Sequence, residues 1–561
     1  MNNKELSELI FSDIRKSPSD YEKIYPKRKM ADNAMVTRLG PSPTGFIHLG
    51  NLYGAFVDER LAHQSEGVFY LRIEDTDDKR YVDNAVDTII SSLDFFGINF
   101  DEGVTAYGDN GEYGPYIQSE RGEIYRSFAK KLIADGNAYP CFLSENEISD
   151  IRTLQEEKKI SPGIYSGYSK YRDWDKSPEI EEEIISRIKK GDSFVIRLKS
   201  TGTPNAEGEN IRRTKIVDEI RGELHLPENF QDVVIIKATG IPTYHFAHVV
   251  DDHLMRTTHV IRGEEWLPSL PIHIELFEKL GFEPPIYCHT AQLMKLDENG
   301  NKRKLSKRKD PELSLSFYRD MGYHPEAVRE YLLTILNSNY EEWRRDNPDL
   351  DSDKFKFTTS KMNTSGALFD LNKLNDVSKD TLLRIPASEL AIWLRSWSTD
   401  FAPEYSYLFD DIKYLEKILD IGRNDKKPRK DLAYARQIID FISYFWDNSF
   451  KIEDEFPLEI VKNDDVNNIL RLYLDTYDHN DDNSTWFDKI RNIATDLGYA
   501  GKPKDYKKNP DDFKGHVGHV STVIRIAIMG RSNSPDIWTI QQILGEDKVK
   551  NRLLKAISNS K

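Results

Sequence analysis

The sequence predicts a doubly wound α/β fold, in which helices cover a mostly parallel sheet, followed by a region made of helices. Between residues 34 and 96, apolar residues alternate between strand-like and helix-like spacing, and the alternation returns after residue 231. Beyond about residue 380 the strand signals fade and helical periodicity dominates. These observations place an α/β part before an all-α part.

Length and composition indicate a large globular protein of a reducing compartment. A chain of 561 residues is expected to form several domains. Its 38% hydrophobic and 31% charged residues are typical of globular proteins, and we expect neither a secretory leader nor a membrane span. Two distant cysteines exclude a disulfide scaffold and a cysteine-rich zinc site, and they favour a cytoplasmic location. The net charge of -16 argues against general polyanion binding.

The first elements of the α/β part follow the order strand, helix, strand, helix. Residues 1–34 form a polar extension, helical or loose, ahead of them. Ala34–Leu39 is the first predicted strand and ends at a turn rich in glycine and proline, after which residues 52–62 show helical spacing. Val68–Ile73 is the second strand and Ala85–Phe96 the next helix. This order implies parallel pairing of the strands.

The middle of the chain, about residues 106–230, has many tyrosines and long charged helices such as Pro178–Lys190. We interpret it as a domain inserted into the α/β fold. The alternation resumes at Asp232–Lys237 and continues through His259–Arg262 and Ile272–Leu280. The sheet is therefore expected to take strands from both sides of the insertion.

Two apolar stripes at helical spacing define helices near the end of the chain. Ser484 is expected to cap the start of the second helix and Gly498 its end. Packing of helices on one another explains both stripes fully, so they predict structure and not function. The first stripe is Val466, Ile469, Leu470, Tyr473 and Tyr477, and the second is Trp486, Phe487, Ile490, Ile493, Ala494 and Leu497.

The segment Thr44–Asn51 lies between a predicted strand and a helix, where α/β sheets bind ligands. Its glycines allow the backbone to approach a nucleotide, and the following helix offers free N–H groups to anionic oxygen. His48 can hydrogen-bond a phosphate or stabilise charge that develops in a transition state. Taken alone, a histidine with a structural role explains this turn equally well.

A second segment, Lys304–Arg308, lies in a basic run that extends from residue 302 to 309. On charge density alone, a solvated loop is the simpler interpretation. Lys304 and Lys307, three residues apart, can however place two ammonium groups on a polyphosphate. Nucleotidyl transfer to a carboxylate needs in-line attack and stabilisation of the leaving pyrophosphate, with magnesium as the expected counter-ion.

Together the two segments resemble the HIGH and KMSKS signatures of the class I aminoacyl-tRNA synthetases, in the same order and at a similar separation. Two positions depart from those signatures: Asn51 stands in place of the last histidine of the first, and Leu305 in place of the methionine of the second. The glutamyl branch commonly varies at both positions. The departures therefore do not predict a loss of activity.

Further segments are similar to the glutamyl-tRNA synthetases of bacterial type and follow that family's order. The similarity runs from about Met35 to Asp380 and is thinner afterwards, with later matches at Phe369–Leu371 and Ile526–Gly530. The similar segments are Arg38–Gly45, Arg72–Asp77, Gly114–Arg121, Pro242–His245, Val249–His253, Ile261–Trp266 and Ser306–Lys309.

The resemblance implies a Rossmann-type catalytic domain with an inserted domain that binds the tRNA acceptor stem, followed by an all-α anticodon-binding region. The expected divisions are an N-terminal extension (1–34), the first half of the catalytic domain (35–105), the inserted domain (106–230), the second half with the KMSKS-like loop (231–310), a helical domain that contacts the tRNA stem (311–380) and a helical anticodon-binding domain (381–561).

The resemblance also implies roles for individual residues. A guanidinium binds a carboxylate in two-pronged fashion, which would select glutamate over glutamine, although a buried Arg262–Glu265 pair could instead only hold the fold. The expected glutamate-binding residues are Arg38, Gly40, Ser42, Glu74, Tyr244 and Arg262. The expected ATP-binding residues are Pro41, Ser42, Thr44, Gly45, His48, Gly50, Asn51, Glu265, Trp266, Lys304, Leu305, Ser306, Lys307 and Arg308, of which His48, Lys304 and Lys307 are expected to be catalytic.

Two residues carry separate expectations. Cys141 stands where some family members place the first of several zinc ligands, but the other ligands are missing, so we expect no zinc and interpret the residue as a packed thiol. Arg429 matches an arginine that reads the third anticodon base, which would restrict the enzyme to tRNA-Glu. A solvated, lysine-rich turn is the equal alternative for Arg429.

The implied function is glutamate–tRNA ligase activity, with ATP, L-glutamate and tRNA-Glu as partners, no membrane partner and a monomeric state. A glutaminyl enzyme is the nearest rival, but it should have β-barrels in place of C-terminal helices. An enzyme that also charges tRNA-Gln is a second rival. A truncated relative that modifies a tRNA base would lack the helical tail.

Two rivals belong to other classes. A non-catalytic tRNA-binding homologue is disfavoured because His48, Lys304 and Lys307 are all intact. A small-molecule nucleotidyltransferase with the same turn would have no need of the long helical region at the end of the chain.

Overall fold

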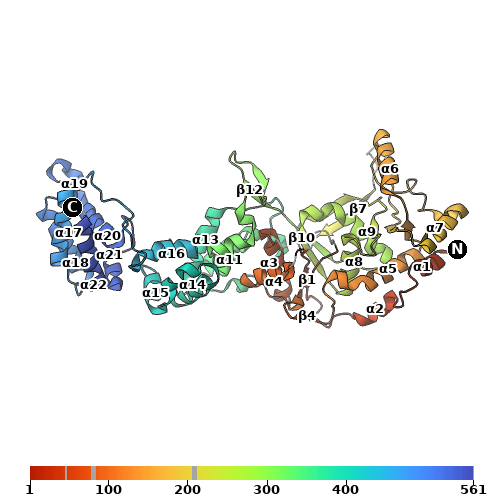
Figure 1. Ribbon diagram of the computed structural model, residues 1–561, viewed down its shortest axis with the longest axis horizontal. Helices are drawn as coiled ribbons and strands as arrows, with labels where there is room; N and C mark the ends of the chain where they lie inside the picture. Colours follow the sequence, from red (N-terminus) through yellow and green to blue (C-terminus); the bar gives the residue numbers. More distant parts are fainter. Residues whose placement is uncertain (44–46, 77–81, 83, 205–211, 560–561) are drawn as a thin grey trace. The chain divides into compact units, whose positions relative to one another are not determined.

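The computed structural model describes residues 1–561 except 44–46, 77–81, 83, 205–211 and 560–561 (Figure 1). Its chain forms two compact units. Unit 1 consists of Met1–Phe317 and Arg329–Asp370, and unit 2 of Tyr318–Val328 and Leu371–Lys561. The finer domain divisions expected from the sequence remain predictions.

Unit 1 is built on two sheets of four strands, each with a parallel core and one antiparallel strand at its edge. The sheets meet where Thr258 N donates to Val36 O at 2.9 Å. In the order of pairing, the first sheet is β1 (Val36–Leu39), β2 (Val68–Leu71), β3 (Glu102–Thr105) and β4 (Gly108–Asn110), and the second is β10 (His259–Gly263), β11 (Ile286–Thr290), β7 (Arg213–Asp218) and β8 (Gly222–Pro227).

Helices alternate with the parallel strands along the chain, and one of them, Leu49–Gln64, packs on both sheets, which confirms the doubly wound α/β prediction. The apolar face of α3 is fully buried along most of its length, against β1, β2 and β10, because leucine, phenylalanine and alanine recur at helical spacing. The helices are α3 (Leu49–Gln64), α4 (Ala85–Phe95), α8 (Tyr244–Leu254) and α9 (Leu270–Leu280).

The middle of the chain forms an additional antiparallel sheet, and it also adds two strands to the sheet of β10 and β11. Strands β5 (Ala138–Cys141), β6 (Val195–Leu198) and β9 (Val234–Ile236) pair in that order. The hairpin of β7 and β8, which we placed in the insertion, instead joins the parallel sheet beside β11. The helices of this part are α5 (Gly122–Ala134), α6 (Glu145–Glu157) and α7 (Pro178–Lys190).

After the parallel sheet, the chain forms a short sheet in unit 1 and three helices, the first two of which have residues in both units. Strand β12 pairs antiparallel with β13 and parallel with β14. The strands are β12 (Leu293–Leu296), β13 (Lys302–Lys304) and β14 (Ala367–Leu368), and the helices that lie between β13 and β14 in the sequence are α10 (Leu315–Met321), α11 (Pro325–Leu336) and α12 (Tyr340–Asp346).

The N-terminal extension is an ordered strap, as its helices α1 (Asn3–Ile10) and α2 (Pro18–Ile24) pack on α5. Arg28, just beyond α2, donates to both carboxylate oxygens of Glu102 at 2.7 and 2.9 Å and to Met255 O at 3.1 Å. Arg256 has a left-handed backbone, with φ of 63°, and its Nη2 donates to Glu22 at 2.7 Å. The strap therefore holds the end of α8 against β3.

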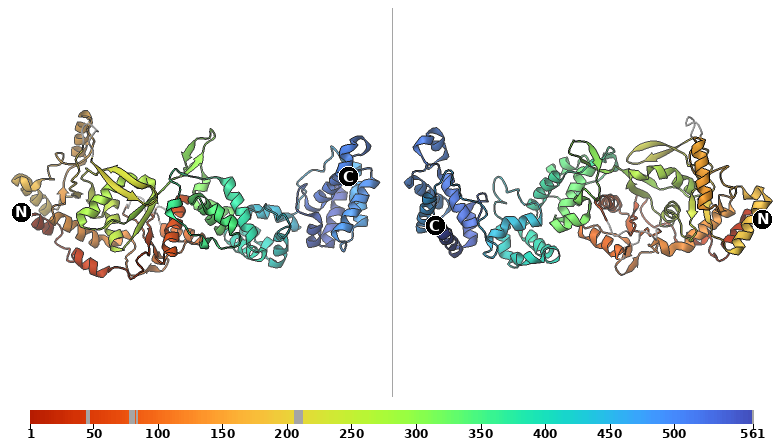
Figure 2. Two further views of the ribbon diagram at one scale, coloured as in Figure 1. Left: turned by 180° about the vertical axis from the view of Figure 1, so that it is seen from behind. Right: turned by 45° about the horizontal axis from the view of Figure 1, so that its top comes forward.

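Unit 2 contains helices and no extended strand among its described residues, as both views in Figure 2 show. This confirms the helical prediction and disfavours a C-terminal region of β-barrels. Its helices are α13 (Leu371–Arg384), α14 (Ala387–Phe401), α15 (Ile412–Leu419), α16 (Ala435–Ile442), α17 (Asn463–Thr476), α18 (Asn483–Asp496), α19 (Pro503–Lys508), α20 (Val517–Met529), α21 (Ile537–Leu544) and α22 (Glu546–Asn559).

The two predicted apolar stripes lie on α17 and α18, and most of their residues are buried. The predicted cap Ser484 is wrong. Asp482 caps α18 instead, because its carboxylate accepts from Thr485 N at 2.7 Å, and a carboxylate also suits the positive end of the helix dipole. Leu497 is the C-cap of α18, and Gly498 follows it with φ of 85°, in the left-handed conformation typical of a glycine just beyond a C-cap.

The strap predicts a measurable loss of stability when Arg28 is truncated. Its side chain is 8% exposed, so Arg28→Ala leaves the largely buried Glu102 carboxylate without a cation, with the Tyr116 hydroxyl at 2.8 Å as its remaining partner. We expect the free energy of unfolding of unit 1 to fall by about 2 kcal/mol in urea denaturation. Lys29→Ala, which removes an exposed neighbouring charge, is the control and should change little. Equal effects of the two substitutions would contradict this role of the strap.

Candidate active site

Unit 1 encloses a cavity of about 590 Å³ at the carboxyl ends of β1 and β10, beside the N-terminus of α3. This is the position at which open α/β sheets bind ligands. The predicted site residues that line it are Arg38, Gly40, Pro41, Ser42, His48, Gly50, Asn51, Glu74, Tyr244, Arg262, Glu265, Trp266, Lys304 and Leu305.

The remaining predicted residues lie elsewhere. Ser306, Lys307 and Arg308 directly follow the lining residue Leu305 but do not themselves line the cavity. Thr44 and Gly45 lie outside the described residues. Arg429 belongs to unit 2.

His48 and Asn51 cap the start of α3 reciprocally. His48 N donates to the Asn51 side-chain oxygen at 3.0 Å, and Asn51 N donates to His48 Nδ1 at 3.2 Å. Because Nδ1 accepts, the proton of a neutral His48 lies on Nε2. Burial, and then the positive charge of Lys307, lower the pKa of His48, so the imidazole is neutral near pH 7. Asn51 thus fixes the tautomer of His48.

Glycine at position 40 is required by close packing. A Cβ atom there would come within 2.3 Å of Glu74 Oε1. The Glu74 carboxylate accepts from Arg72 Nη2 at 2.9 Å and is 8% exposed. The backbone that follows β1 can therefore approach this carboxylate only without a side chain.

Asp252, on α8, lies beneath the cavity between two arginines and a histidine. Its carboxylate is 2.6 Å from Arg72 Nη1, 3.5 Å from Arg38 Nε and 2.9 Å from His248 Nδ1. Burial raises the pKa of Asp252, but the charges of Arg72 and Arg38 outweigh it and hold the pKa well below the ordinary value. The carboxylate is therefore ionised and fixes Arg38 at the cavity wall.

Arg262 is held by histidines. Its Nε donates to His289 Nε2 at 2.9 Å, and its Nη1 lies 3.1 Å from His273 Nδ1. His273 Nε2 lies in turn 2.9 Å from His245 Nδ1. The alternative in which Arg262 pairs with Glu265 is wrong, since the Glu265 carboxylate instead accepts from the side chain of Gln292 at 3.3 Å.

An ion pair fixes the KMSKS-like loop. Arg303 donates from Nη1 and Nη2 to the two oxygens of Asp310, each at 2.6 Å, and Ser306 N donates to the same carboxylate at 2.8 Å. Hydrogen bonds from Arg303 lower the pKa of Asp310 strongly. Leu305 is 6% exposed and Lys304 lines the cavity, so a purely solvated loop does not describe this segment.

Sequence reasoning missed several residues that support the site. Neither strand register nor the position of a helix behind a sheet is visible in hydrophobic periodicity. Register brings together only the two missed residues that lie on strands, and four others lie on helices α8 and α9. The missed residues are Arg72, Asp218, His245, His248, Asp252, His273, His289 and Asp310.

Cys141 is buried, with its sulfur 4.0 Å from Ser169 Oγ. Across the residues that the structure describes, no group of three or more histidine, cysteine, aspartate or glutamate side chains is arranged to hold a metal ion. The environment of Cys141 is that of a packed thiol.

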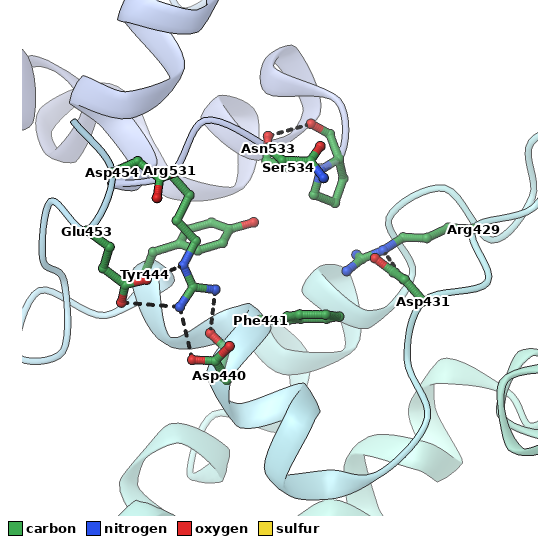
Figure 3. Close-up of a pocket in the computed structure, with 11 residues that line it drawn as sticks. Arg429, Asp431, Asp440, Phe441, Tyr444, Glu453, Asp454, Arg531, Asn533 and Ser534 are labelled. Atoms are coloured by element: carbon green, nitrogen blue, oxygen red, sulfur yellow. Dashed lines mark hydrogen bonds and ion pairs between the residues drawn. The ribbon is translucent and has the colours of Figure 1, made fainter. Parts of the chain in front are cut away.

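Unit 2 has a pocket of about 580 Å³ between α16 and the loop after α20 (Figure 3). Arg429 lines it and donates from Nε to Asp431 at 2.5 Å. Arg531 is held by Asp440 at 3.0 Å and Glu453 at 2.7 Å. The ring of Phe441 also lines this pocket. The pocket thus combines two arginines, each paired with a carboxylate of the pocket wall, with an aromatic face.

Comparison with known proteins identifies the family of this chain. The family model "tRNA synthetases class I (E and Q), catalytic domain" matches residues 34–375, and the model "Anticodon binding domain" matches residues 507–557. A protein of Acetivibrio thermocellus named glutamate–tRNA ligase is 58% identical over 99% of this chain and 100% of its own length. The chain belongs to the glutamate–tRNA ligase family of class I tRNA synthetases.

Other relatives agree over the whole chain. A glutamate–tRNA ligase of Clostridium perfringens is 46% identical over 99% of this chain and 100% of its own length. Among solved structures, a glutamate tRNA ligase from Elizabethkingia meningosepticum, in complex with its amino acid, covers 94% of this chain and 100% of its own with a TM-score of 0.73 and 26% identity.

None of the described helices is both long and apolar enough to cross a bilayer.

The histidines beneath the cavity predict acid-sensitive stability. Burial lowers the pKa of His245 to about 4, whereas an unfolded histidine titrates near 6.5. Between these values only the unfolded state binds the proton, so the stabilisation present above pH 6.5 is lost as the pH falls. For this one group the free energy of unfolding should decrease by up to about 1.4 kcal/mol per pH unit.

Urea denaturation of the protein and of His245→Asn, between pH 6.5 and 5, tests this prediction. The asparagine oxygen can replace Nδ1 as the acceptor for His273, so the variant should show a shallower dependence on pH. His225→Asn, at an exposed position, is the control and should keep the dependence of the unaltered protein. An unchanged slope in His245→Asn would contradict the assignment.

Proposed function

We propose that this chain activates L-glutamate with ATP and transfers the glutamyl group to the terminal adenosine of tRNA-Glu. One observation carries the proposal: a single cavity brings Glu74 and two arginines, Arg38 and Arg262, together with His48 and Lys304. The first three match the charges of an amino acid with a side-chain carboxylate, and the last two match a polyphosphate. The relatives' names support the choice of glutamate and of tRNA.

The residues of the proposed glutamate site divide by charge. Glu74 is the partner of the substrate ammonium, and Arg38 and Arg262 are the partners of its carboxylates. We assign Arg262 to the side-chain carboxylate, since a neutral amide there would leave a buried cation without compensation. Tyr244, Ser42 and Gly40 complete the wall around the substrate.

The proposed ATP site begins at the N-terminus of α3. The free backbone N–H groups of this helix and the Nε2–H of His48 are donors to phosphate oxygen. Lys304 and Lys307 add positive charge from the opposite segment of the chain. The other contacts assigned to ATP are Pro41, Ser42, Thr44, Gly45, Gly50, Asn51, Glu265, Trp266, Leu305, Ser306 and Arg308.

The proposed reaction has two steps. An oxygen of glutamate's α-carboxylate attacks the α-phosphorus of ATP, and the bond from that phosphorus to the pyrophosphate oxygen breaks. The neutral His48 and the two lysines stabilise the negative charge that develops, and they do so without covalent participation. The 2′-hydroxyl of the terminal tRNA ribose then attacks the activated carbonyl and releases AMP.

Magnesium is expected to enter with ATP as a counter-ion of its phosphates. The chain's own donors fit this assignment, because the described residues offer no group of three acidic, histidine or cysteine ligands that would form a metal cage. Lysines at the leaving group would then share charge neutralisation with the ion.

The pocket of unit 2 supports a role for Arg429 in reading the anticodon. Arg429 lines it together with Arg531, and Arg531 falls within the range matched by the anticodon-binding family model. An arginine guanidinium and the Phe441 ring suit a base whose edge is read and whose face is stacked. Reading of the third anticodon base by Arg429 would restrict the enzyme to tRNA-Glu.

Exchange of pyrophosphate into ATP tests the first step. We expect exchange with glutamate and not with glutamine, and only in the presence of tRNA-Glu. Lys307→Ala should lower the exchange rate about 100-fold while changing the KM for glutamate little, because the lysine acts on the leaving group. Lys302→Ala, at an exposed position outside the cavity, is the control. Exchange with glutamine, or an unchanged rate in Lys307→Ala, would refute the proposal.

Charging of the two tRNAs tests the role of Arg429. Arg429→Gln should increase the glutamylation of tRNA-Gln relative to tRNA-Glu by about tenfold, because the substitution removes the charged donor that discriminates between their third anticodon bases. Lys427→Gln, in the same turn but exposed, should leave the ratio unchanged. A ratio that Arg429→Gln does not alter would return Arg429 to the alternative of a solvated turn.

A further inference from the structure

We propose that Asp218 and His289 are positioning residues that hold Arg262 through a neutral imidazole and so reserve its positive charge for the side-chain carboxylate of glutamate. The inference rests on the proposed contact between Arg262 and that carboxylate. It adds to the site a specificity device formed by residues that do not line the cavity.

Strand register builds this arrangement. Arg262 on β10 stands directly opposite His289 on the parallel strand β11, and Asp218 is the residue through which β7 pairs with β11. Arg262 Nε donates to His289 Nε2 at 2.9 Å, and His289 Nδ1 lies 2.7 Å from Asp218 Oδ2. Hydrogen bonds thus join the three side chains in one row across three adjacent strands, and Asp218 reaches His289 from a position opposite Tyr287.

The position of each proton in this row follows from chemistry. A guanidinium N–H can only donate, so Nε2 of His289 must accept and carry no proton. The proton of the imidazole therefore lies on Nδ1 and is donated to Asp218. Burial lowers the pKa of His289, and the nearby charge of Arg262 acts in the same sense, so the ring stays neutral. Asp218 selects the tautomer that Arg262 needs.

A second neutral acceptor stands on the other side of Arg262. Nη1 of the guanidinium donates to His273 Nδ1 at 3.1 Å, so the His273 proton lies on Nε2 and is donated to His245 Nδ1 at 2.9 Å. Burial, together with neighbouring positive groups, holds the pKa of His273 well below its ordinary value. Both side-chain acceptors of Arg262 are therefore uncharged.

Two other buried arginines of unit 1 have carboxylates as partners, whereas Arg262 does not. Arg72 and Arg121 have no exposed surface, and each pairs with a carboxylate, Arg72 with Asp252 at 2.6 Å and Arg121 with Asp251 at 2.7 Å. Arg262 is 8% exposed and has no carboxylate partner among the described residues, where its Nη2 atom also has no hydrogen-bond partner. The cavity-lining arginine alone of these three keeps an uncompensated charge.

This charge is what distinguishes the two substrates. A glutamate carboxylate compensates the buried guanidinium, whereas the glutamine amide leaves it unpaired in a poorly solvated site. A carboxylate placed directly on Arg262 by the protein would weaken that discrimination. Separation of Asp218 from Arg262 by a neutral ring provides an anchor without direct neutralisation.

Substitutions of His289 test the inference with a matched pair. In His289→Gln the side-chain oxygen takes the place of Nε2 and can still accept from Arg262. In His289→Asn the amide takes the place of Nδ1, so Asp218 keeps a donor but nothing reaches Arg262 Nε. We expect His289→Asn to raise the KM for glutamate about tenfold and to lower the preference for glutamate over glutamine similarly, with His289→Gln close to the unaltered enzyme. The KM for ATP should stay within about twofold in both.

Asp218→Asn supplies an independent test. Ile220 N and Arg221 N donate to Oδ1 of Asp218, at 3.0 and 2.9 Å, and His289 N donates to Oδ2 at 3.0 Å. The oxygen of an asparagine would stay with the two donors at Oδ1, so its NH₂ group would face His289 Nδ1 and lose the bond from His289 N. The histidine proton would then move to Nε2 and oppose Arg262 Nε–H. Asp218→Asn should therefore behave as His289→Asn, and adding His289→Gln to it should restore the glutamate KM, since glutamine has no tautomer to lose.

All variants are assayed as full-length enzyme with tRNA-Glu, and their thermal unfolding is measured. Equal glutamate KM values in His289→Asn and His289→Gln, or additive losses in the double variant, would overturn the inference. Arg262→Lys separates the positioning role of Asp218 and His289 from the proposed contact between Arg262 and glutamate. If Arg262→Lys leaves the glutamate KM unchanged, the proposed contact of Arg262 with glutamate fails; if it raises this KM while His289→Asn does not, only the positioning role fails.

Discussion

The carboxylate of Asp252 is the interaction on which the site depends. It joins α8 to the ends of β1 and β2, because it lies 2.6 Å from Arg72 and 3.5 Å from Arg38. Without this anion Arg38 would lose its ion pair and Arg72 would keep only the Glu74 carboxylate, a penalty of several kcal/mol. Helix α8 also carries Tyr244 at its start. One ion cluster therefore sets the position of a helix and two strand ends, and with them the cavity residues Arg38, Glu74 and Tyr244.

The cavity is an example of charge distributed by partner choice. Arg72 is neutralised and structural, Arg38 shares its carboxylate, and Arg262 is held by uncharged rings. The three arginines therefore differ in how much charge they offer to a ligand, although all are buried. In a site of low polarity such differences matter more than distance alone, because solvent does not level them.

Much of the fold could be predicted from the sequence, because alternating strand and helix periodicity encodes a doubly wound sheet directly. Most of the proposed site residues also lie together at one cavity, since they lie in or next to motifs at strand ends and at a helix start. The row formed by Asp218, His289 and Arg262 could not be predicted, because register depends on packing across the sheet. For the same reason β7 and β8 were assigned to the insertion, although they pair with the parallel sheet.

The roles of individual polar residues also depend on neighbours that hydrophobic periodicity does not reveal. Asp482 and Ser484 both suit a helix start, and the carboxylate is chosen because it reaches Thr485 N. Arg429 illustrates a different limit: its residue type predicts recognition and a solvated turn equally, and only a pocket lined by an aromatic ring favours the first.

The reciprocal cap at the start of α3 explains which residues can close the HIGH-like signature. Position 51 must present an acceptor to His48 N, which lies 3.0 Å from the asparagine oxygen. Aspartate would satisfy that geometry, but it would place a negative charge at the proposed ATP site, where the phosphates bring several more. Asparagine offers the same acceptor without charge. Helix capping alone would allow either residue at position 51, and the proposed nucleotide site favours the uncharged one.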